Sequence, residues 1–251
     1  MAIMATQVFL IGAGPGDPDL ITLKAIKALQ AADVVLVDDL VNRTLLGHAP
    51  QARVIPVGKR GGCKSTPQAF INRLMVRLAR QGRIVARLKG GDPFLFGRGG
   101  EEMLALAAAD VTVEIVPGIT SGIAAPAAIG IPVTHRGASH GVTFVTGHTQ
   151  DGRNPNWAAL AASGTTLAIY MGMQQLGTIV AELLAGGLAG DTPAAAIQNG
   201  TLDSQRHVAC TLRQLPEAVA REELGSPAIV VIGQVAALAQ NAVLGGLQAA
   251  A

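Results

Sequence analysis

Residues 84–102 contain the feature that most constrains the fold: a strand-like apolar run, a glycine-rich turn and a helix start in direct succession. The turn holds Gly90 and Gly91, whose lack of a Cβ lets backbone approach a ligand closely. In an open α/β sheet, ligands bind at the carboxyl ends of the strands. A tight connection that merely needs glycines is the plainer alternative for any one glycine. Five glycines, an Asp and two basic residues in one turn favour a binding site.

The same succession of strand and helix recurs through the first half of the chain, which predicts a mostly parallel sheet. In the second half, strand patterns follow one another without long helices, which predicts some antiparallel pairing. We therefore expect an α/β fold with two α/β domains, residues 1–117 and residues 118–251, the second with a linker helix and a mixed sheet. The expected strands are 8–12, 33–38, 53–57, 84–88, 111–116, 142–146, 165–171, 194–198, 207–212 and 228–232, and the expected helices are 20–29, 66–81, 119–129, 174–184, 215–223 and one that starts near 99.

The basic residues are unevenly distributed along the chain. Of its 19 Lys and Arg residues, 12 lie between Arg43 and Arg98, and Asp92 is the only acid in that interval. Those at 73, 77 and 80 have helical spacing and indicate a solvated helix face. Such a bias suggests an anionic partner, either a nucleic acid or a polycarboxylate or phosphate ligand. Few aromatic side chains are available to stack on single strands, so we expect no nucleic acid.

The first glycine-rich loop suggests a dinucleotide site. Gly12 and Gly14 fit the start of a G-x-G-x-x-G fingerprint, and an acid, Asp38, ends the next expected strand. However, Asp17 stands where the third glycine should be, and Pro15 stiffens the loop. These departures make a nicotinamide cofactor the weaker alternative.

Composition indicates a folded protein, with 49% apolar and 14% charged residues. No apolar run reaches the roughly 18 residues of a membrane helix, and no signal peptide is evident, so we expect no membrane association. The two cysteines and five histidines show no metal-binding spacing, so no metal is expected. The expected location is the cytoplasm.

Several motifs together resemble the tetrapyrrole methylase family, over about residues 8–238. The resemblance is most specific to those members that methylate uroporphyrinogen III, although the first loop motif occurs across the whole family. The matching segments are Gly12-Ala13-Gly14-Pro15-Gly16-Asp17-Pro18 with 20–24, Val57-Gly58-Lys59-Arg60, residues 90–102, Pro117-Gly118-Ile119-Thr120-Ser121, Pro132-Val133-Thr134-His135-Arg136, Thr146-Gly147-His148 and Tyr170-Met171-Gly172.

The resemblance implies a homodimer with its active site in a cleft between two α/β domains. It implies S-adenosyl-L-methionine as cofactor, with S-adenosyl-L-homocysteine as product. The implied reaction methylates two pyrrole carbons of uroporphyrinogen III to give precorrin-2, for siroheme and cobalamin biosynthesis. The cofactor contacts that it implies are Pro15, Gly90, Gly91, Asp92, Leu95, Thr120, Ser121, Met171 and Gly200.

Two catalytic positions are also implied: Asp38 as the proton acceptor and Lys59 as the proton donor. Lys59 could equally be a clamp for a substrate carboxylate. Val37 stands where relatives often have Tyr, which removes a hydroxyl from the site. The nearest alternative is a family member that acts on a later corrinoid precursor.

The expected substrate is a tetrapyrrole polycarboxylate, which needs dispersed positive charge in its binding site. Guanidinium groups match carboxylates bidentately. We expect Glu101 and Glu102 to be helix-start residues and not catalysts, because acids suit the first turn of a helix. The loop residues expected to bind substrate are Arg60, Lys64, Arg98 and Arg136.

Overall fold

The computed structural model describes residues 7–58, 66–148 and 154–240. The chain divides into two compact units, Met1–Thr120 (unit 1) and Ser121–Ala251 (unit 2), and each is described by itself. The domain boundary expected from the sequence lies after residue 117, and it stays a prediction.

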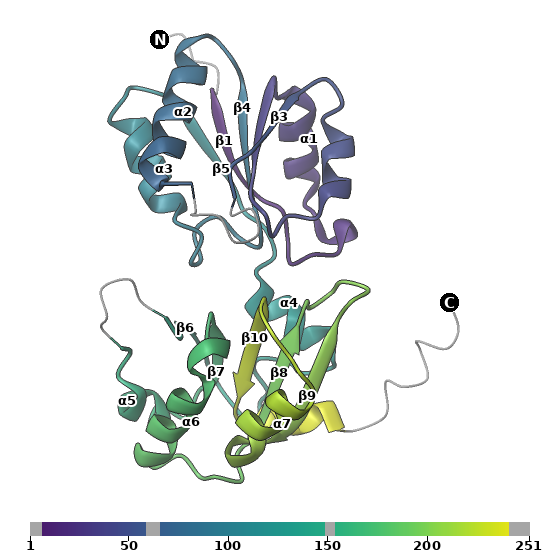
Figure 1. Cartoon of the computed structure of the whole chain (residues 1–251), viewed down its shortest axis with the longest axis vertical. Coiled ribbons are helices and arrows are strands. Elements are labelled where there is room, and N and C mark those ends of the chain that lie inside the picture. The colour runs from purple at the N-terminus through teal and green to yellow at the C-terminus, as the bar shows by residue number, and fades with distance from the viewer. Residues whose placement is uncertain (1–6, 59–65, 149–153, 241–251) are drawn as a thin grey trace. The chain divides into compact units, whose positions relative to one another are not determined.

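Unit 1 contains a five-stranded, fully parallel sheet with the strand order β3-β2-β4-β1-β5. Figure 1 shows α1 on one side of this sheet and α2 and α3 on the other. The predicted parallel sheet is thus confirmed. The strands are β1 (Val8–Gly12), β2 (Val34–Val37), β3 (Arg53–Pro56), β4 (Val85–Lys89) and β5 (Val113–Val116), the helices are α1 (Leu23–Ala31), α2 (Gln68–Arg80) and α3 (Gly99–Ala107), and two short 3-10 helices span Pro18–Leu20 and Arg43–His48.

Two central strands of unit 1, β1 and β2, are apolar on both faces because helices cover both. Successive residues of a strand point to opposite faces. In β2, Val35 and Val37 pack in the cluster that contains the α1 side chains, whereas Val34 and Leu36 pack in the cluster that contains the α2 side chains. The continuous apolar run of each strand, with no polar alternation, follows from this double burial.

The first helix begins later than the sequence suggests. Asp17 caps the start of a 3-10 turn, where its side chain accepts a hydrogen bond from Asp19 N at 2.9 Å, and the turn ends at Leu20. The α-helix starts at Leu23, capped by the Thr22 side chain, which accepts from Ala25 N at 3.1 Å. The short turn and the α-helix therefore each have their own capping residue, Asp17 and Thr22.

Unit 2 has a mixed five-stranded sheet with the order β6-β7-β10-β8-β9. β6 and β7 are parallel, whereas β10 is antiparallel to both β7 and β8, and β8 is antiparallel to β9. The predicted mixture of parallel and antiparallel pairs is confirmed. The elements are α4 (Ser121–Ala127), β6 (Val142–Thr146), α5 (Trp157–Ala161), β7 (Thr166–Tyr170), α6 (Leu176–Ala185), β8 (Pro193–Gln198), β9 (Arg206–Thr211), α7 (Leu215–Arg221) and β10 (Ala228–Ile232), with 3-10 helices at Met173–Gln175, Leu212–Gln214 and Gln234–Gln240.

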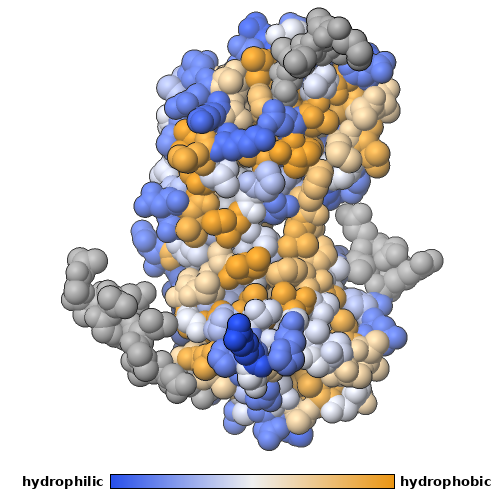
Figure 2. All heavy atoms as spheres, turned by 180° about the vertical axis from the view of Figure 1, so that it is seen from behind, coloured by the Kyte–Doolittle hydropathy of each residue, from blue (hydrophilic) through white to orange (hydrophobic). Residues whose placement is uncertain are grey.

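The larger core of unit 2 lies under α5, α6 and α7. Trp157 opens α5 and is 3% exposed, packed with apolar side chains of α6 and the sheet. The sequence analysis did not predict α5, whose five residues are too few for a helical period to show. On the face seen in Figure 2, hydrophobic and hydrophilic side chains are interspersed. Within the described residues, no helix has the length and apolarity needed to span a membrane.

Candidate functional site

Three loops meet at the carboxyl end of the unit 1 sheet, and glycines allow them to meet. Gly12 ends β1, Gly91 follows β4 and Gly118 follows β5. A Cβ added to Gly118 would lie 2.3 Å from the Gly91 carbonyl oxygen and 2.8 Å from Gly12 Cα. A Cβ added to Gly12 would lie 2.6 Å from the same carbonyl oxygen. No real side chain tolerates such distances, so positions 12 and 118 require glycine. The glycine-rich turn expected from the sequence therefore serves close packing of backbone against backbone.

Hydrogen bonds hold these loops in place. Gly91 N donates to Gly14 O at 2.7 Å, and Gly14 N donates back to Gly91 O at 3.2 Å. The Asp92 carboxylate accepts from Phe94 N at 2.8 Å through Oδ1 and from Gly118 N at 3.1 Å through Oδ2. Gly91 and Asp92 thus have a structural role that the sequence analysis missed. Their assignment to the cofactor stays a prediction, as do those of Gly90, Pro15, Leu95 and Thr120, which are half-buried at the same loops.

We expect Gly118→Ala to lower the melting temperature and to weaken S-adenosylhomocysteine binding at least tenfold, because the new Cβ overlaps backbone atoms that cannot move independently. Thermal unfolding and calorimetry measure both effects. Gly100→Ala is the matched control, since nothing lies within 4 Å of its added Cβ and it sits in α3. The control should be neutral or stabilising by up to about 1 kcal/mol. Equal behaviour of the two variants would contradict the close-packing argument.

Two residues of the loop before α3 have a left-handed backbone. Phe96 has φ 54° and Arg98 has φ 60°, a conformation that costs non-glycine residues free energy. The exposed guanidinium of Arg98 binds Glu101 bidentately, at 2.9 Å and 2.7 Å. The hydrogen bonds from Arg98 lower the pKa of Glu101. Arg98 is thus presented at the surface in one orientation.

A buried charged cluster lies beneath these loops, and strand register explains it. Leu36 in β2 pairs with Arg87 in β4, and Leu36 packs on the face that carries α2 and α3. Because side chains alternate, Arg87 and Lys89 share that face, and Asp38, two residues after Leu36, points the same way. Glu102 meets them from the first turn of α3. We call Asp38, Arg87, Lys89 and Glu102 the four-charge cluster.

The four-charge cluster is tightly connected. Arg87 Nε donates to Glu102 Oε1 at 3.0 Å, and Arg87 Nη2 donates to Asp38 Oδ1 at 2.7 Å. Lys89 Nζ lies 3.0 Å from both oxygens of Glu102 and 4.0 Å from Asp38 Oδ2. The side chains of Arg87, Lys89 and Glu102 are at most 3% exposed, but that of Asp38 is 28% exposed. Asp38 is therefore the member of the cluster whose side chain reaches solvent.

Burial lowers the pKa of Lys89, and the neighbouring Arg87 guanidinium lowers it further. Glu102 and Asp38 act in the opposite direction and favour the charged amine.

Glu102 is in the first turn of α3, as predicted, but the sequence analysis missed its partners. Two cations at alternate positions of an otherwise apolar strand, 87 and 89, were the available signal, since such charges need a buried acid nearby.

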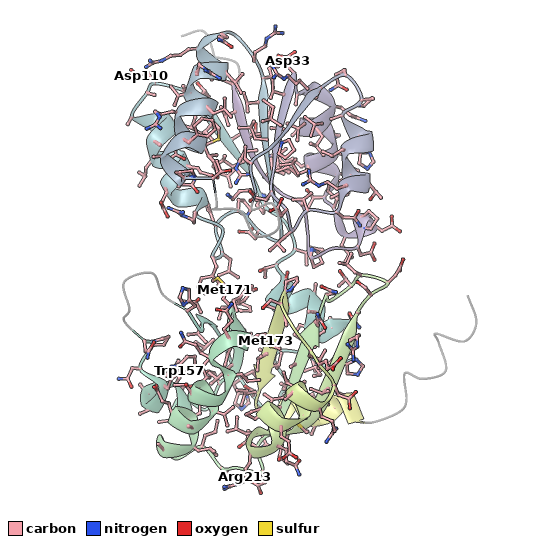
Figure 3. All side chains as sticks on the ribbon, viewed as in Figure 1. Asp33, Asp110, Trp157, Met171, Met173 and Arg213 are labelled. Carbon is pink, nitrogen blue, oxygen red and sulfur yellow. The ribbon has the colours of Figure 1, made fainter. Side chains whose placement is uncertain are left out.

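In unit 2, the predicted cofactor residues lie at the carboxyl ends of β7 and β8 and at the start of α4. β6, β7 and β8 run in the same direction, because β7 and β8 are both antiparallel to β10. Met171 follows β7, where Figure 3 shows it, with φ 54° and half of its surface exposed. A Cβ on Gly200, after β8, would lie 2.4 Å from Ala125 Cβ in α4. Ser121 begins α4.

A tyrosine connects α4 to this end of the sheet. Tyr170, the last residue of β7, accepts a hydrogen bond through its hydroxyl from Gly122 N at 2.6 Å. The structure thus brings the surroundings of Ser121, Met171 and Gly200 together within unit 2. Their contact with a cofactor stays a prediction.

Arg136, predicted to bind substrate, is exposed in a tight turn of unit 2, closed by backbone hydrogen bonds of 2.9 Å and 2.8 Å between His135 and Ser139. Lys59, Arg60 and Lys64 lie outside the described residues.

Comparison with known proteins identifies the family. The family model described as tetrapyrrole (corrin/porphyrin) methylases matches residues 7–216 of the sequence. A protein of Pseudomonas aeruginosa named uroporphyrinogen-III C-methyltransferase is 60% identical over 232 residues, which are 92% of this chain and 95% of the relative.

Solved structures agree with the sequence relatives. The uroporphyrin-III C-methyl transferase of Thermus thermophilus, complexed with S-adenyl homocysteine, superposes with a TM-score of 0.79 at 40% identity, over 91% of this chain and 92% of the other. A cobalt precorrin-4 methyltransferase superposes with a TM-score of 0.82 at 30% identity, over 91% and 95% of the two chains. The chain therefore belongs to the tetrapyrrole methylase family.

Proposed function

We propose that this protein is an S-adenosylmethionine-dependent C-methyltransferase that methylates two pyrrole carbons of uroporphyrinogen III to give precorrin-2. The observation that carries the proposal is the 60% identity, over 92% of the chain, to a protein named for this activity. The relative named for a later corrinoid precursor is only 30% identical, although its fold superposes as well as that of the Thermus thermophilus protein. Because the fold is shared across the family, identity is the better guide to the substrate.

The loops of unit 1 fit a cofactor with an amino-acid moiety. A Cβ on Gly12 or Gly118 would intrude on the Gly91 carbonyl, so backbone packs against backbone and leaves peptide groups at the carboxyl end of a parallel sheet. We propose that Gly90, Gly91 and Asp92 hold the amino-acid part of S-adenosylmethionine there. The bound cofactor supplies the sulfonium methyl group.

The chemistry needs alignment and a proton acceptor. The electron-rich pyrrole carbon forms a bond to the methyl carbon, and the electron pair of the broken S–C bond stays on sulfur. The ring is left with a positive charge and then loses a proton. We propose that the Asp38 carboxylate first stabilises this charge and then accepts the proton, becoming a neutral acid. Its side chain is 28% exposed, so the carboxylate is accessible to a ligand, which both roles require.

Substrate carboxylates need cations on loops. Arg98 and Arg136 are exposed and come from unit 1 and unit 2, respectively. We propose that both bind substrate carboxylates, together with Arg60 and Lys64. Lys59 is proposed as a proton donor or a carboxylate clamp. The homodimer and the cytoplasmic location expected from the sequence stay predictions.

A product assay tests the proposed function. Purified protein incubated anaerobically with S-adenosylmethionine and uroporphyrinogen III should yield a tetrapyrrole carrying two added methyl groups, as measured by mass spectrometry. A panel with later corrinoid precursors separates the proposal from its nearest alternative. Methylation of a later precursor with none of uroporphyrinogen III would overturn the substrate assignment. Calorimetry should show binding of S-adenosylhomocysteine, and tight binding of NAD alone would exclude the methyl transfer.

A further inference from the structure

The two oxygens of the Asp38 carboxylate have different surroundings. Oδ1 accepts a hydrogen bond of 2.7 Å from Arg87 Nη2. Oδ2 is 4.0 Å from Lys89 Nζ, beyond hydrogen-bonding distance. Among the described residues, the carboxylate is thus hydrogen-bonded by the four-charge cluster through Oδ1 and not through Oδ2. Because Asp38 is the one member of the four-charge cluster with substantial exposure, its less constrained oxygen is the one available to a ligand.

Arg87 itself is held at each of its three nitrogens. Nε donates to Glu102 Oε1 at 3.0 Å, Nη1 lies 3.4 Å from the carbonyl oxygens of Leu36 and Leu88, and Nη2 bonds Asp38. A planar guanidinium bound on three sides cannot rotate. The position of Asp38 Oδ1 is therefore determined by the sheet backbone and by α3, through Arg87.

Such a cluster is a costly way to fill a core. Desolvation of buried charges often exceeds their mutual attraction, so apolar residues of the same volume would give equal or greater stability. The cluster contains two cations and two anions and is neutral overall, which makes it tolerable but not advantageous for folding. A role in function accounts better for its presence.

We propose that Arg87 is a positioning residue, which holds Asp38 by Oδ1 and so presents Oδ2 to the reacting ring. Glu102, which also binds Lys89, holds Arg87 from the opposite side. The proposal rests on the proposed function, since it requires Asp38 to act on the methylated ring. The lowered pKa of Lys89 agrees with this division of roles, because a guanidinium holds its charge more firmly than an amine does in a buried position.

Arg87→Lys tests the proposal. Lysine keeps the charge but cannot bond Glu102, the two carbonyls and Asp38 together. We expect kcat to fall by about 10–100-fold, the loss that a misplacement of about 1 Å causes, while KM and the Kd for S-adenosylhomocysteine change less than threefold. Turnover is measured with methyl-labelled cofactor in excess over enzyme and over a range of tetrapyrrole concentrations, well below each melting temperature. Arg77→Lys, on the exposed face of α2, is the control and should match the wild type.

A double-mutant cycle separates positioning from a purely structural role. In the Asp38→Asn background, Arg87→Lys should change the residual turnover less than twofold, because there is no longer a carboxylate to position. An equal loss in both backgrounds, or an unchanged kcat in Arg87→Lys alone, would overturn the proposal. If the wild type methylates no tetrapyrrole, the proposed function itself fails, and the wild-type control reveals this.

A second variant covers the case in which Arg87→Lys does not fold. Arg87→Met combined with Glu102→Gln removes one buried cation and one buried anion and leaves Lys89 to balance Asp38. This neutral variant should fold and bind S-adenosylhomocysteine as the wild type does, yet lose kcat by a similar factor. Retention of wild-type kcat in this variant would refute the positioning role.

Discussion

Replacing Asp38 with Asn is expected to lower turnover by about 10²–10⁴-fold, the range typical for loss of an acid–base group, with S-adenosylhomocysteine binding unchanged within threefold. The amide keeps the shape of the carboxylate but carries no charge to stabilise the methylated ring and accepts no proton. Asp38 is partly exposed at the end of β2, so its substitution leaves the apolar core intact. Asp38→Ala should show the same loss.

Asp39→Asn is the matched control for this substitution. It makes the same chemical change one residue further on, at an exposed side chain that lies 3.7 Å from Arg43. Its turnover should remain within twofold of the wild type. Steady-state kinetics and calorimetry on the wild type and the three variants check the prediction, and wild-type turnover in Asp38→Asn would remove Asp38 from the mechanism.

Replacing Glu102 with Gln is expected to reduce the free energy of unfolding by about 3–5 kcal/mol, the usual loss when one partner of a buried ion pair is removed. Glu102 is completely buried, and its carboxylate lies 3.0 Å from both Arg87 Nε and Lys89 Nζ. Without it, two buried cations face Asp38 alone. Urea unfolding followed by circular dichroism measures the change through the midpoint at constant slope.

The neighbouring residue offers a control for position in the helix. Glu101→Gln removes a carboxylate from the same first turn of α3, but its pair with Arg98 is exposed. Exposed pairs contribute only about 0.2–1 kcal/mol, so the loss should stay within that range. Comparable losses in the two variants would show that the helix dipole, and not the buried pairing, accounts for the effect.

Much of the fold could be predicted because it depends on short-range patterns. Apolar runs without polar alternation, such as 8–12 and 34–37, are read correctly as strands, which the structure covers on both sides. The start of α1 was wrong by several residues because Asp17 and Thr22 are both good caps, and sequence alone does not rank them. The short helix α5 was missed for want of a full period.

The candidate site was predicted unevenly. The glycine-rich turn after β4 was expected to approach a ligand, and its Gly91 carbonyl proves to be approached by two other loops, at Gly12 and Gly118, where a Cβ would not fit. That requirement involves residues 12, 91 and 118, far apart in the chain, so no local pattern contains it. Arg98 and Arg136 were expected on loops and are exposed there, because cations without buried partners remain in water.

The sequence by itself determined the class of fold, the position of the strand ends and the family, because periodicity and motifs are local properties of the chain. Only the tertiary structure decided which charges are buried together. Asp38, Arg87, Lys89 and Glu102 meet because strand register and the packing of α3 on the sheet set which faces coincide. Register depends on contacts between distant segments, and a shift of β4 by one residue would turn Arg87 and Lys89 to the opposite face of the sheet.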